Sequence, residues 1–238
     1  RKAFLPKQDW LLVDADYSQI ELRVLAYMAQ DKAMLEAFSS GMDIHTQTAA
    51  KIFDMPVEFV TPQMRSRAKA VNFGIVYGIS AFGLANDIGV SNKEAKEYID
   101  SYNRTYIGIN EYMESVIEFA KKNGYVETLF GYRRYIPELK IPKTRAFGER
   151  IARNTPIQGT AAEIIKLAMV NVFNRLNKEC PKAKLIMQVH DELIVECEEN
   201  DISQVSDILK TEMENVIKDK YTFKVDIHTG KNWLEAKG

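Results

Sequence analysis

The stretch Arg65-Ser66-Arg67-Ala68-Lys69-Ala70-Val71-Asn72-Phe73-Gly74-Ile75-Val76-Tyr77-Gly78 is the segment around which the rest of this 238-residue sequence is organised. It contains no proline, and Arg, Ala and Lys favour a helix at its start. Four of its side chains recur every four residues: Arg65, Lys69, Phe73 and Tyr77. On a helix they form a slowly drifting stripe about 18 Å long. Two cations followed by two aromatic rings match the layout of a nucleoside triphosphate, which is charged at one end and carries a flat base at the other. A basic helix start that leads into a core-facing aromatic end is the alternative.

Composition narrows the class of protein. The net charge is −1, so any nucleic-acid binding must depend on local patches. The two cysteines, Cys180 and Cys197, form neither a disulfide framework nor a metal-ligand pattern and fit a reducing cytoplasm. No signal peptide and no apolar run near the ~20 residues of a membrane span is present. We therefore expect a cytoplasmic monomer without a membrane partner. The sequence opens without Met shortly before an apolar run, which predicts a fragment of a longer protein.

An apolar run near the start ends in carboxylates. Residues 10–17, Trp-Leu-Leu-Val-Asp-Ala-Asp-Tyr, are typical of a buried strand. Such a strand would hold Asp16 rigidly at its tip as a metal ligand. Alternatively, Asp16 is the N-cap of the next helix, a position that Ser18 also suits.

A second helix start is predicted at Asp43, as an N-cap after Gly41. His45 then lies in the first turn, where backbone N–H groups favour an anion. An ordinary surface or core histidine is the alternative. Thr61 and Pro62 are typical of the start of the helix that carries the stripe.

Basic side chains accumulate in residues 131–153. This segment contains Arg133, Arg134, Lys140, Lys143, Arg145, Arg150 and Arg153, against Glu138 and Glu149. Two prolines predict a loop that leads into a helix. The charge suits a phosphate backbone, and a solvated basic surface is the alternative. The amides of Asn154 and Gln158 follow and can bond to minor-groove base edges. We expect Pro156 to kink or restart this helix.

Two apolar strand runs, residues 184–189 and 192–197, are separated only by His190 and Asp191, which is the length of a hairpin turn. A tight turn normally takes Asn-Gly or Asp-Gly. His-Asp followed by Glu192 is poor turn chemistry, and such exceptions tend to occur where function requires them. Asp191 as a plain polar turn residue is the alternative.

The remaining patterns are structural. Ser91 and Glu94 form a predicted capping box, and amphipathic helices are expected over residues 110–122, closed by Gly124, and 203–218. Residues 223–227 alternate as a last half-buried strand.

Strands cluster at both ends of the sequence while its middle is helical. This distribution predicts an α+β fold in which a helical domain is inserted into an antiparallel-sheet domain. Asp16 and Asp191 meet if their strands are neighbours. Two close carboxylates repel unless cations lie between them. Two divalent metals about 3.5–4 Å apart would satisfy them and would activate an attacking oxygen beside a leaving phosphate oxygen.

Three motifs carry a family resemblance. Asp16-Tyr17-Ser18-Gln19-Ile20-Glu21-Leu22-Arg23 resembles the first polymerase motif of the family A DNA polymerases. Arg65-x-x-x-Lys69-x-x-x-Phe73-Gly74-x-x-Tyr77-Gly78 resembles the second, and Gln188-Val189-His190-Asp191-Glu192 resembles the third. The motifs occur in the family's order, and the likeness extends from Arg1 to the C-terminus.

The resemblance implies template-directed DNA synthesis, in which a dNTP is transferred to a primer 3′-OH with two Mg²⁺ ions. Asp16 and Asp191 match the magnesium-binding aspartates, with the Tyr17 carbonyl as a further ligand. Lys69 matches the lysine that contacts the triphosphate and is proposed to protonate pyrophosphate. His45 and Arg65 match further contacts to the triphosphate, and Gln19 is a further implied nucleotide contact. Glu21 matches the gate against a ribose 2′-hydroxyl, and Tyr77 matches the residue that stacks at the insertion site. Phe73 occupies a position where a Phe disfavours dideoxynucleotides.

Five residues match contacts to primer–template DNA: Arg150, Asn154, Gln158, Gln188 and His190. Glu192 matches an acidic neighbour of less defined role. The implied right-hand fold has a palm in residues 1–30 and 151–238 and helical fingers in residues 31–150. The thumb, the exonuclease-type domain and the earlier palm strands of the family have no counterpart in these residues. Since the thumb supplies many phosphate contacts, we expect the chain alone to be weakly active or inactive.

Three other functions are weighed against this one. A single-subunit RNA polymerase shares the aspartates and a Lys–Tyr helix, but a carboxylate at Glu21 should exclude ribonucleotides. A module that binds nucleotide or DNA without chemistry would not need the pair Asp16 and Asp191. A helical structural protein would match the three motifs only by accident.

Overall fold

The computed structural model describes residues 1–219 and 221–238, and it is an α+β fold that divides into two compact units. Unit 1 comprises Arg1–Ile20 and Ala161–Gly238, and unit 2 comprises Glu21–Thr160. The chain thus leaves the sheet unit after its first strand and returns to it 140 residues later. Within the described residues, every helix is too short or too polar to cross a lipid bilayer.

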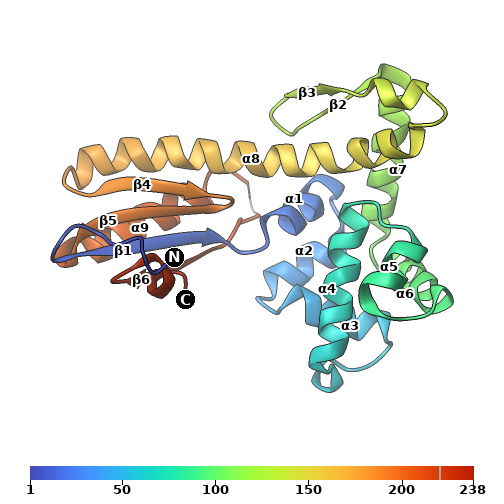
Figure 1. Cartoon of the computed structure of the whole chain (residues 1–238), viewed down its shortest axis with the longest axis horizontal. Helices are drawn as coiled ribbons and strands as arrows, with labels where there is room; N and C mark the ends of the chain where they lie inside the picture. Colours follow the sequence, from blue (N-terminus) through green and yellow to red (C-terminus); the bar gives the residue numbers. More distant parts are fainter. Residues whose placement is uncertain (220) are drawn as a thin grey trace. The chain divides into compact units, whose positions relative to one another are not determined.

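Unit 1 is built on a four-stranded sheet in which all neighbouring strands are antiparallel (Figure 1). The strand order is β4 (Lys184–Val189), β5 (Glu192–Glu198), β1 (Trp10–Tyr17) and β6 (Val225–Gly230). The predicted strands at residues 10–17 and 184–197 are therefore confirmed. The last strand begins at Val225, so the predicted position Phe223 lies before it, as a buried core residue.

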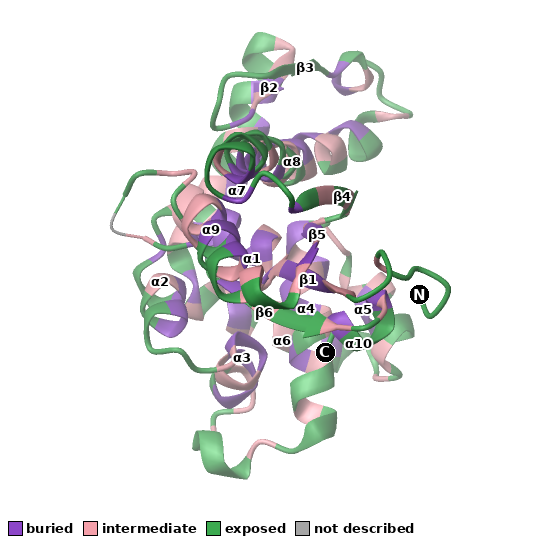
Figure 2. Cartoon of the chain, turned by 90° about the vertical axis from the view of Figure 1, so that its left-hand side faces the viewer, coloured by how far each residue is buried: buried purple, intermediate pink, exposed green. Residues whose placement is uncertain are grey.

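The sheet packs on both faces, because side chains alternate between the faces along each strand. Helix α9 (Ile202–Glu214) packs against β1, β5 and β6 with its apolar stripe of Val205, Ile208, Leu209 and Met213. The short helix α10 (Trp233–Ala236) forms a second cluster with Leu12 and Ile194. In Figure 2 the central strands β1 and β5 are purple, whereas the edge strand β6 is largely green. Burial on both faces explains the continuous apolar run of β1.

Unit 2 is mainly helical. Its helices are α1 (Ile20–Ala29), α2 (Lys32–Ser39), α3 (Ile44–Ile52), the 3₁₀ turn η1 (Val57–Phe59), α4 (Pro62–Val76), α5 (Ala81–Ile88), α6 (Asn92–Thr105) and α7 (Ile107–Asn123). A two-stranded hairpin follows, β2 (Tyr125–Glu127) and β3 (Arg133–Tyr135), and then the 3₁₀ turn η2 (Pro137–Lys140).

The predicted helix signals form as expected. Asp43 and Thr61 accept from the N–H groups of Thr46 and Met64 at the starts of α3 and α4. The capping box of Ser91 and Glu94 starts α6, and Gly124 ends α7 in the left-handed conformation at φ 80°. The helix predicted over residues 110–122 begins earlier, at Ile107, and the one predicted over residues 203–218 ends at Glu214.

Two expectations about residues 131–179, a loop that leads into a helix and a helix interrupted at Pro156, are met only in part. Part of the basic segment pairs as β3 with β2, because Tyr125 and Tyr135 lie opposite each other with their rings 5.6 Å apart. Pro156 does not restart the helix: α8 runs without a break from Arg145 to Glu179 (Figure 1). The missing proline N–H removes one helical hydrogen bond, but Ala152 and Ile157 on either side are fully buried. Tertiary packing therefore overrides the local penalty.

Candidate polymerase site

The end of strand β1 and the tip of the β4–β5 hairpin lie side by side in unit 1. The N–H of Tyr17 donates to the carbonyl oxygen of Asp191 at 3.2 Å, and the ladder pairs Asp16 with Glu192. Antiparallel pairing of β1 with β5 therefore brings Asp16 and Asp191, 175 positions apart in the sequence, to the same end of one sheet.

The hairpin tip has the strained geometry that its sequence suggests. His190 adopts a positive φ of 53°, which costs a non-glycine residue roughly 1–2 kcal/mol. The side-chain amide of Gln188 donates to the carbonyl oxygen of His190 at 2.6 Å and holds the turn. Gln188 and His190 are both exposed. The strain thus lies at the residue directly before Asp191.

Carboxylates are concentrated at this end of the sheet. Burial, followed by the Glu192 carboxylate, raises the pKa of Asp14 to about 7. Burial, followed by the nearby charge of Asp16, raises the pKa of Asp191. The ammonium of Lys237 lies 2.7 Å from Oδ2 of Asp16 and also pairs with Glu192. Burial is the main cause of both pKa shifts, and the neighbouring carboxylates add to it.

The carboxylates fit a divalent cation. Oδ1 of Asp16 and Oε1 of Glu192 are buried and have no hydrogen-bond partner in the described chain. No three His, Cys, Asp or Glu side chains of the described residues form a metal-binding group. Mg²⁺, however, is typically held by one or two carboxylates together with waters and substrate phosphates. Asp16 and Asp191 lie at the same end of the sheet and carry carboxylates of the type that such an ion prefers.

The predicted stripe lies on the exposed face of α4 in unit 2. Arg65, Lys69 and Tyr77 are exposed and Phe73 is half-buried. Ala68, Val71, Asn72, Gly74 and Val76 form the buried face. The rings of Phe73 and Tyr77 stack at 6.4 Å with an interplanar angle of 19°. The aromatic end is therefore not a core-facing surface.

Arg65 is bound to the N-cap of helix α3. Its Nε lies 2.8 Å from Oδ2 of Asp43, and its second guanidinium nitrogen lies 2.9 Å from Oδ1. Burial alone would raise the pKa of Asp43, but the hydrogen bonds from Arg65 and Thr46 lower it to about 2. A bidentate pair of this kind presents the guanidinium in one orientation. The sequence contains no local signal for this pairing across 22 residues.

His45 lies behind the stripe and is 2 % exposed. The side-chain amide of Asn72 contacts its Nδ1 at 3.0 Å, and its ring lies 5.7 Å from that of Phe73. Burial, opposed by Asp43 and reinforced by Arg65 and Lys69, lowers its pKa to about 4. The ring is therefore neutral at pH 7. This burial favours the core interpretation of His45 over a direct contact to an anion.

Glu21 and the end of the stripe meet within unit 2. The hydroxyl of Tyr77 donates to Oε2 of Glu21 at 2.8 Å. Burial, followed by Glu21, raises the pKa of Tyr77 to about 12, while Gln158 lowers it. A cavity of about 520 Å³ lies beside them and is lined by Phe73, Tyr77 and Arg150 among others. Three predicted nucleotide contacts, Glu21, Phe73 and Tyr77, and two predicted DNA contacts, Arg150 and Gln158, thus lie close together.

The other predicted residues have less defined surroundings. Gln19 lies between β1 and α1 with a positive φ of 56°. Oδ1 of Asn154, on α8, is buried without a partner in the described residues. The sequence interpretation missed Lys237 altogether, because a lone lysine near the end of a sequence carries no pattern.

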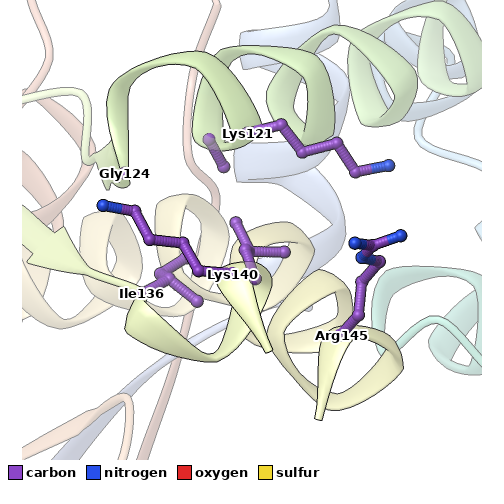
Figure 3. Close-up of a pocket in the computed structure, with 7 residues that line it drawn as sticks. Lys121, Gly124, Ile136, Lys140 and Arg145 are labelled. Atoms are coloured by element: carbon purple, nitrogen blue, oxygen red, sulfur yellow. The ribbon is translucent and has the colours of Figure 1, made fainter. Parts of the chain in front are cut away.

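A basic cavity of about 360 Å³ lies between the end of α7, η2 and the start of α8 (Figure 3). Its polar wall consists of Lys121, Lys140 and Arg145, and its floor of Ala120, Ile136 and Leu139. In Figure 3 the charged groups of Lys121 and Arg145 extend toward one side and that of Lys140 toward the other. Lys121 pairs with Glu149 at 2.7 Å, so the wall retains a surplus of positive charge. We call these three residues the basic cavity wall.

Comparison with known proteins identifies the family of this chain. The sequence profile of DNA polymerase family A matches residues 1–235. The chain therefore belongs to DNA polymerase family A, as the three motifs predicted.

Bacterial DNA polymerase I enzymes are among the relatives of this chain. The chain is 50 % identical over 241 residues to DNA polymerase I of Caldicellulosiruptor bescii, covering 100 % of this chain and 28 % of that protein. It is 48 % identical to DNA polymerase I of Bacillus caldotenax, covering 100 % of this chain and 27 % of that protein. The chain thus spans little more than a quarter of the length of these relatives.

A solved structure has the same fold. The POL domain of Pol1 from M. smegmatis, in complex with DNA primer-template and dNTP, superposes with a TM-score of 0.95 at 37 % identity. The match covers 100 % of this chain and 42 % of that one.

Proposed function

We propose that this chain forms the palm and fingers of an enzyme that performs template-directed DNA synthesis by transferring a nucleotide from a dNTP to a primer 3′-OH. The observation that carries the proposal is the juxtaposition of β1 with the hairpin tip, which brings Asp16 and Asp191 together. The solved relative with primer-template and dNTP supports the same ligands for this chain. In this proposal unit 1 is the palm and unit 2 the fingers; the units divide at residues 20 and 160, whereas the sequence predicted limits at residues 30 and 150.

The residues of unit 1 would hold the metal. Asp16 and Asp191, with the Tyr17 carbonyl, would bind two Mg²⁺ ions through carboxylate and carbonyl oxygens. A metal held by these residues would supply activation of the primer hydroxyl and neutralisation of charge on the leaving phosphate oxygens. The sheet contributes rigidity, because Asp16 is held by ladder bonds to β5 and β6 on both sides.

The exposed face of α4 would receive the nucleotide. Lys69 and Arg65 would hold the triphosphate, for which Arg65 must exchange its carboxylate partner Asp43 for phosphate oxygens. Phe73 and Tyr77 would stack on the base. The carboxylate of Glu21, held by the Tyr77 hydroxyl, would exclude a 2′-hydroxyl. His45, buried and neutral, acts through its packing on Phe73.

DNA would be held by the amides and the basic side chains. Arg150 and Gln158 approach Tyr77, and Asn154, on the same helix, carries a buried oxygen without a partner among the described residues. Gln188 and His190 lie exposed at the hairpin. The basic cavity wall supplies charge for a phosphate backbone. A duplex also needs phosphate contacts beyond these residues, so we expect weak or no synthesis by the chain alone.

A chimera tests the proposal. The 240 matching residues of Bacillus subtilis DNA polymerase I, which are 48 % identical, are replaced by this chain. Primer extension is then compared for the chimera, its Asp191→Ala variant and a control, Asp100→Ala, at an exposed position of α6. We expect extension by the chimera and the control. Asp191→Ala should lose extension while its affinity for primer–template DNA changes by less than about twofold.

Two results would overturn the proposal. The first is a folded chimera, verified by circular dichroism and DNA binding, that does not extend a primer. The second is an Asp191→Ala chimera that still extends one, which would remove the two-metal assignment.

A further inference from the structure

The C-terminal end of helix α10 presents a cation to the predicted metal ligands. Lys237 is the C-cap of this helix. Its ammonium donates to Oδ2 of Asp16 at 2.7 Å and to Oε2 of Glu192. These partners are 221 and 45 positions away in the sequence, so tertiary folding alone creates the contact.

The geometry of the sheet explains why one lysine reaches both carboxylates. Asp16 and Glu192 are directly opposite each other in the β1–β5 ladder, so their side chains leave the same face. The cluster of Leu12, Ile194, Trp233 and Ala236 packs α10 onto strands β1 and β5. Leu12 and Asp16 are four positions apart on β1 and share a face. Helix α10 therefore covers the face from which the carboxylates project.

Each carboxylate gives one oxygen to Lys237 and keeps the other one free. Oδ1 of Asp16 and Oε1 of Glu192 are buried without partners among the described residues. The Lys237 and Glu192 side chains are 24 % and 3 % exposed, so water provides little compensation at Glu192. The arrangement satisfies half of the carboxylate oxygens with a single positive charge and leaves the negative charge of the cluster only partly neutralised.

We propose that Lys237 is the resident counter-ion of this site, which occupies Asp16 when no metal is bound and releases that oxygen to the metal. This proposal rests on the proposed function, since it assumes that Asp16 is a metal ligand. Lys237 is a positioning residue: it holds Asp16 at the end of β1 and prevents the carboxylates from repelling one another. A divalent ion must displace the ammonium from Asp16, after which Lys237 remains on Glu192.

Two measurable consequences follow from this competition. A chain without the ammonium should bind a divalent ion more tightly, because nothing has to be displaced. The gain is about two- to fivefold, as expected for a partly exposed ion pair. The metal-free chain should also unfold earlier, by about 2–4 °C, and a divalent ion should remove this difference.

The test uses Mn²⁺, whose binding is followed by electron paramagnetic resonance, and thermal unfolding in EDTA or in Mn²⁺. The variants are Lys237→Met and Lys237→Gln. The matched control is Lys231→Met, an exposed lysine six positions earlier. Asp16→Asn combined with Asp191→Asn tests the site itself. We expect both Lys237 variants to bind Mn²⁺ more tightly than the unaltered chain and the control, and to lose stability only in EDTA.

Each outcome is decisive. If the unaltered chain and the double Asn variant bind Mn²⁺ equally, the metal assignment of the proposed function fails. If the unaltered chain binds at the aspartates but the Lys237 variants bind no more tightly, the competition proposed here fails alone. A Lys237 variant that folds only in Mn²⁺ supports the proposal. Variants that unfold equally in EDTA and Mn²⁺ would make Lys237 a purely structural residue and overturn it.

Discussion

The hydroxyl of Tyr77 donates a 2.8 Å hydrogen bond to the carboxylate of Glu21, 56 residues earlier in the chain. This bond connects the last residue of the α4 stripe to helix α1. A charged acceptor strengthens such a bond and orients the carboxylate. The two residues that the sequence assigned to base stacking and to sugar selection therefore form one structural pair.

Glu21→Ala should relax the selection of deoxynucleotides. Removal of the carboxylate opens space for a 2′-hydroxyl, and a steric contact of this size is worth about 10- to 200-fold in kcat/KM. We expect the ratio of kcat/KM for dATP over ATP, measured in the chimera, to fall by such a factor. Tyr77→Phe, which keeps the ring and loses the hydroxyl, should lower the ratio less.

The control for this prediction is Glu118→Ala, at an exposed position of α7. Its nucleotide selectivity should equal that of the unaltered chimera. A ratio that does not change in Glu21→Ala would show that another residue selects the sugar, and a chimera that already prefers ribonucleotides would favour the RNA polymerase alternative.

Asp43→Asn should destabilise the chain in a way that disappears in acid. Asn retains the N-cap of α3 but loses the ion pair with Arg65. The pKa of Asp43 is lowered from its ordinary 3.8 to about 2 in the folded chain. The stabilising contribution is therefore full above pH 4 and declines as pH falls toward 2. The difference in unfolding free energy, measured with urea from pH 6 to pH 3, should shrink as the pH is lowered.

Because Asp43 and Arg65 are both partly exposed, the difference at pH 6 should stay below about 1 kcal/mol. Asp43→Ala is the companion variant. It loses the cap as well and should cost a further ~1 kcal/mol that does not depend on the ion pair. Equal effects of Asn and Ala at pH 6 would contradict the assignment of separate roles.

His45 should make the fold sensitive to mild acid. Its pKa is about 4 in the folded chain against an ordinary 6.5, so the unfolded state binds more protons between these values. Stability should consequently fall as pH decreases from about 6.5 to 4. His45→Gln, which cannot titrate, should reduce this slope. A ring signal of His45 that titrates near 6.5 by nuclear magnetic resonance would disprove the prediction.

Charge reversal in the basic cavity wall should weaken DNA binding. Lys140→Glu and Arg145→Glu each replace a cation of the basic cavity wall by an anion. We expect a weaker affinity for primer–template DNA. We also expect the slope of log K against log salt concentration to be shallower by about 1 for each phosphate group that is no longer neutralised. Fluorescence anisotropy at several salt concentrations measures both quantities.

Lys96→Glu is the control, since Lys96 is an exposed lysine on α6 away from the cavity wall. It changes the net charge by the same amount. If it weakens binding as much as the cavity variants do, the effect is a general electrostatic one and the cavity does not hold a phosphate.

The sequence by itself determined most of the local structure and the family, and it predicted the residues of the candidate site. The apolar run of β1, the caps at Asp43, Thr61 and Ser91, and the hairpin around His190 all form where their residues predict. These features depend on neighbours within a few positions. The three motifs were recognisable for the same reason, because each is a short contiguous pattern.

Only the tertiary structure decided which charges are paired. Arg65 pairs with Asp43, which is 22 residues away in the sequence. Glu21 accepts a hydrogen bond from Tyr77 at a separation of 56 residues, and Asp16 pairs with Lys237 at a separation of 221 residues. Tertiary packing also carried α8 through Pro156 and buried His45. Coulomb and packing energies depend on distance in space and on burial, and neither quantity can be read from the order of the residues.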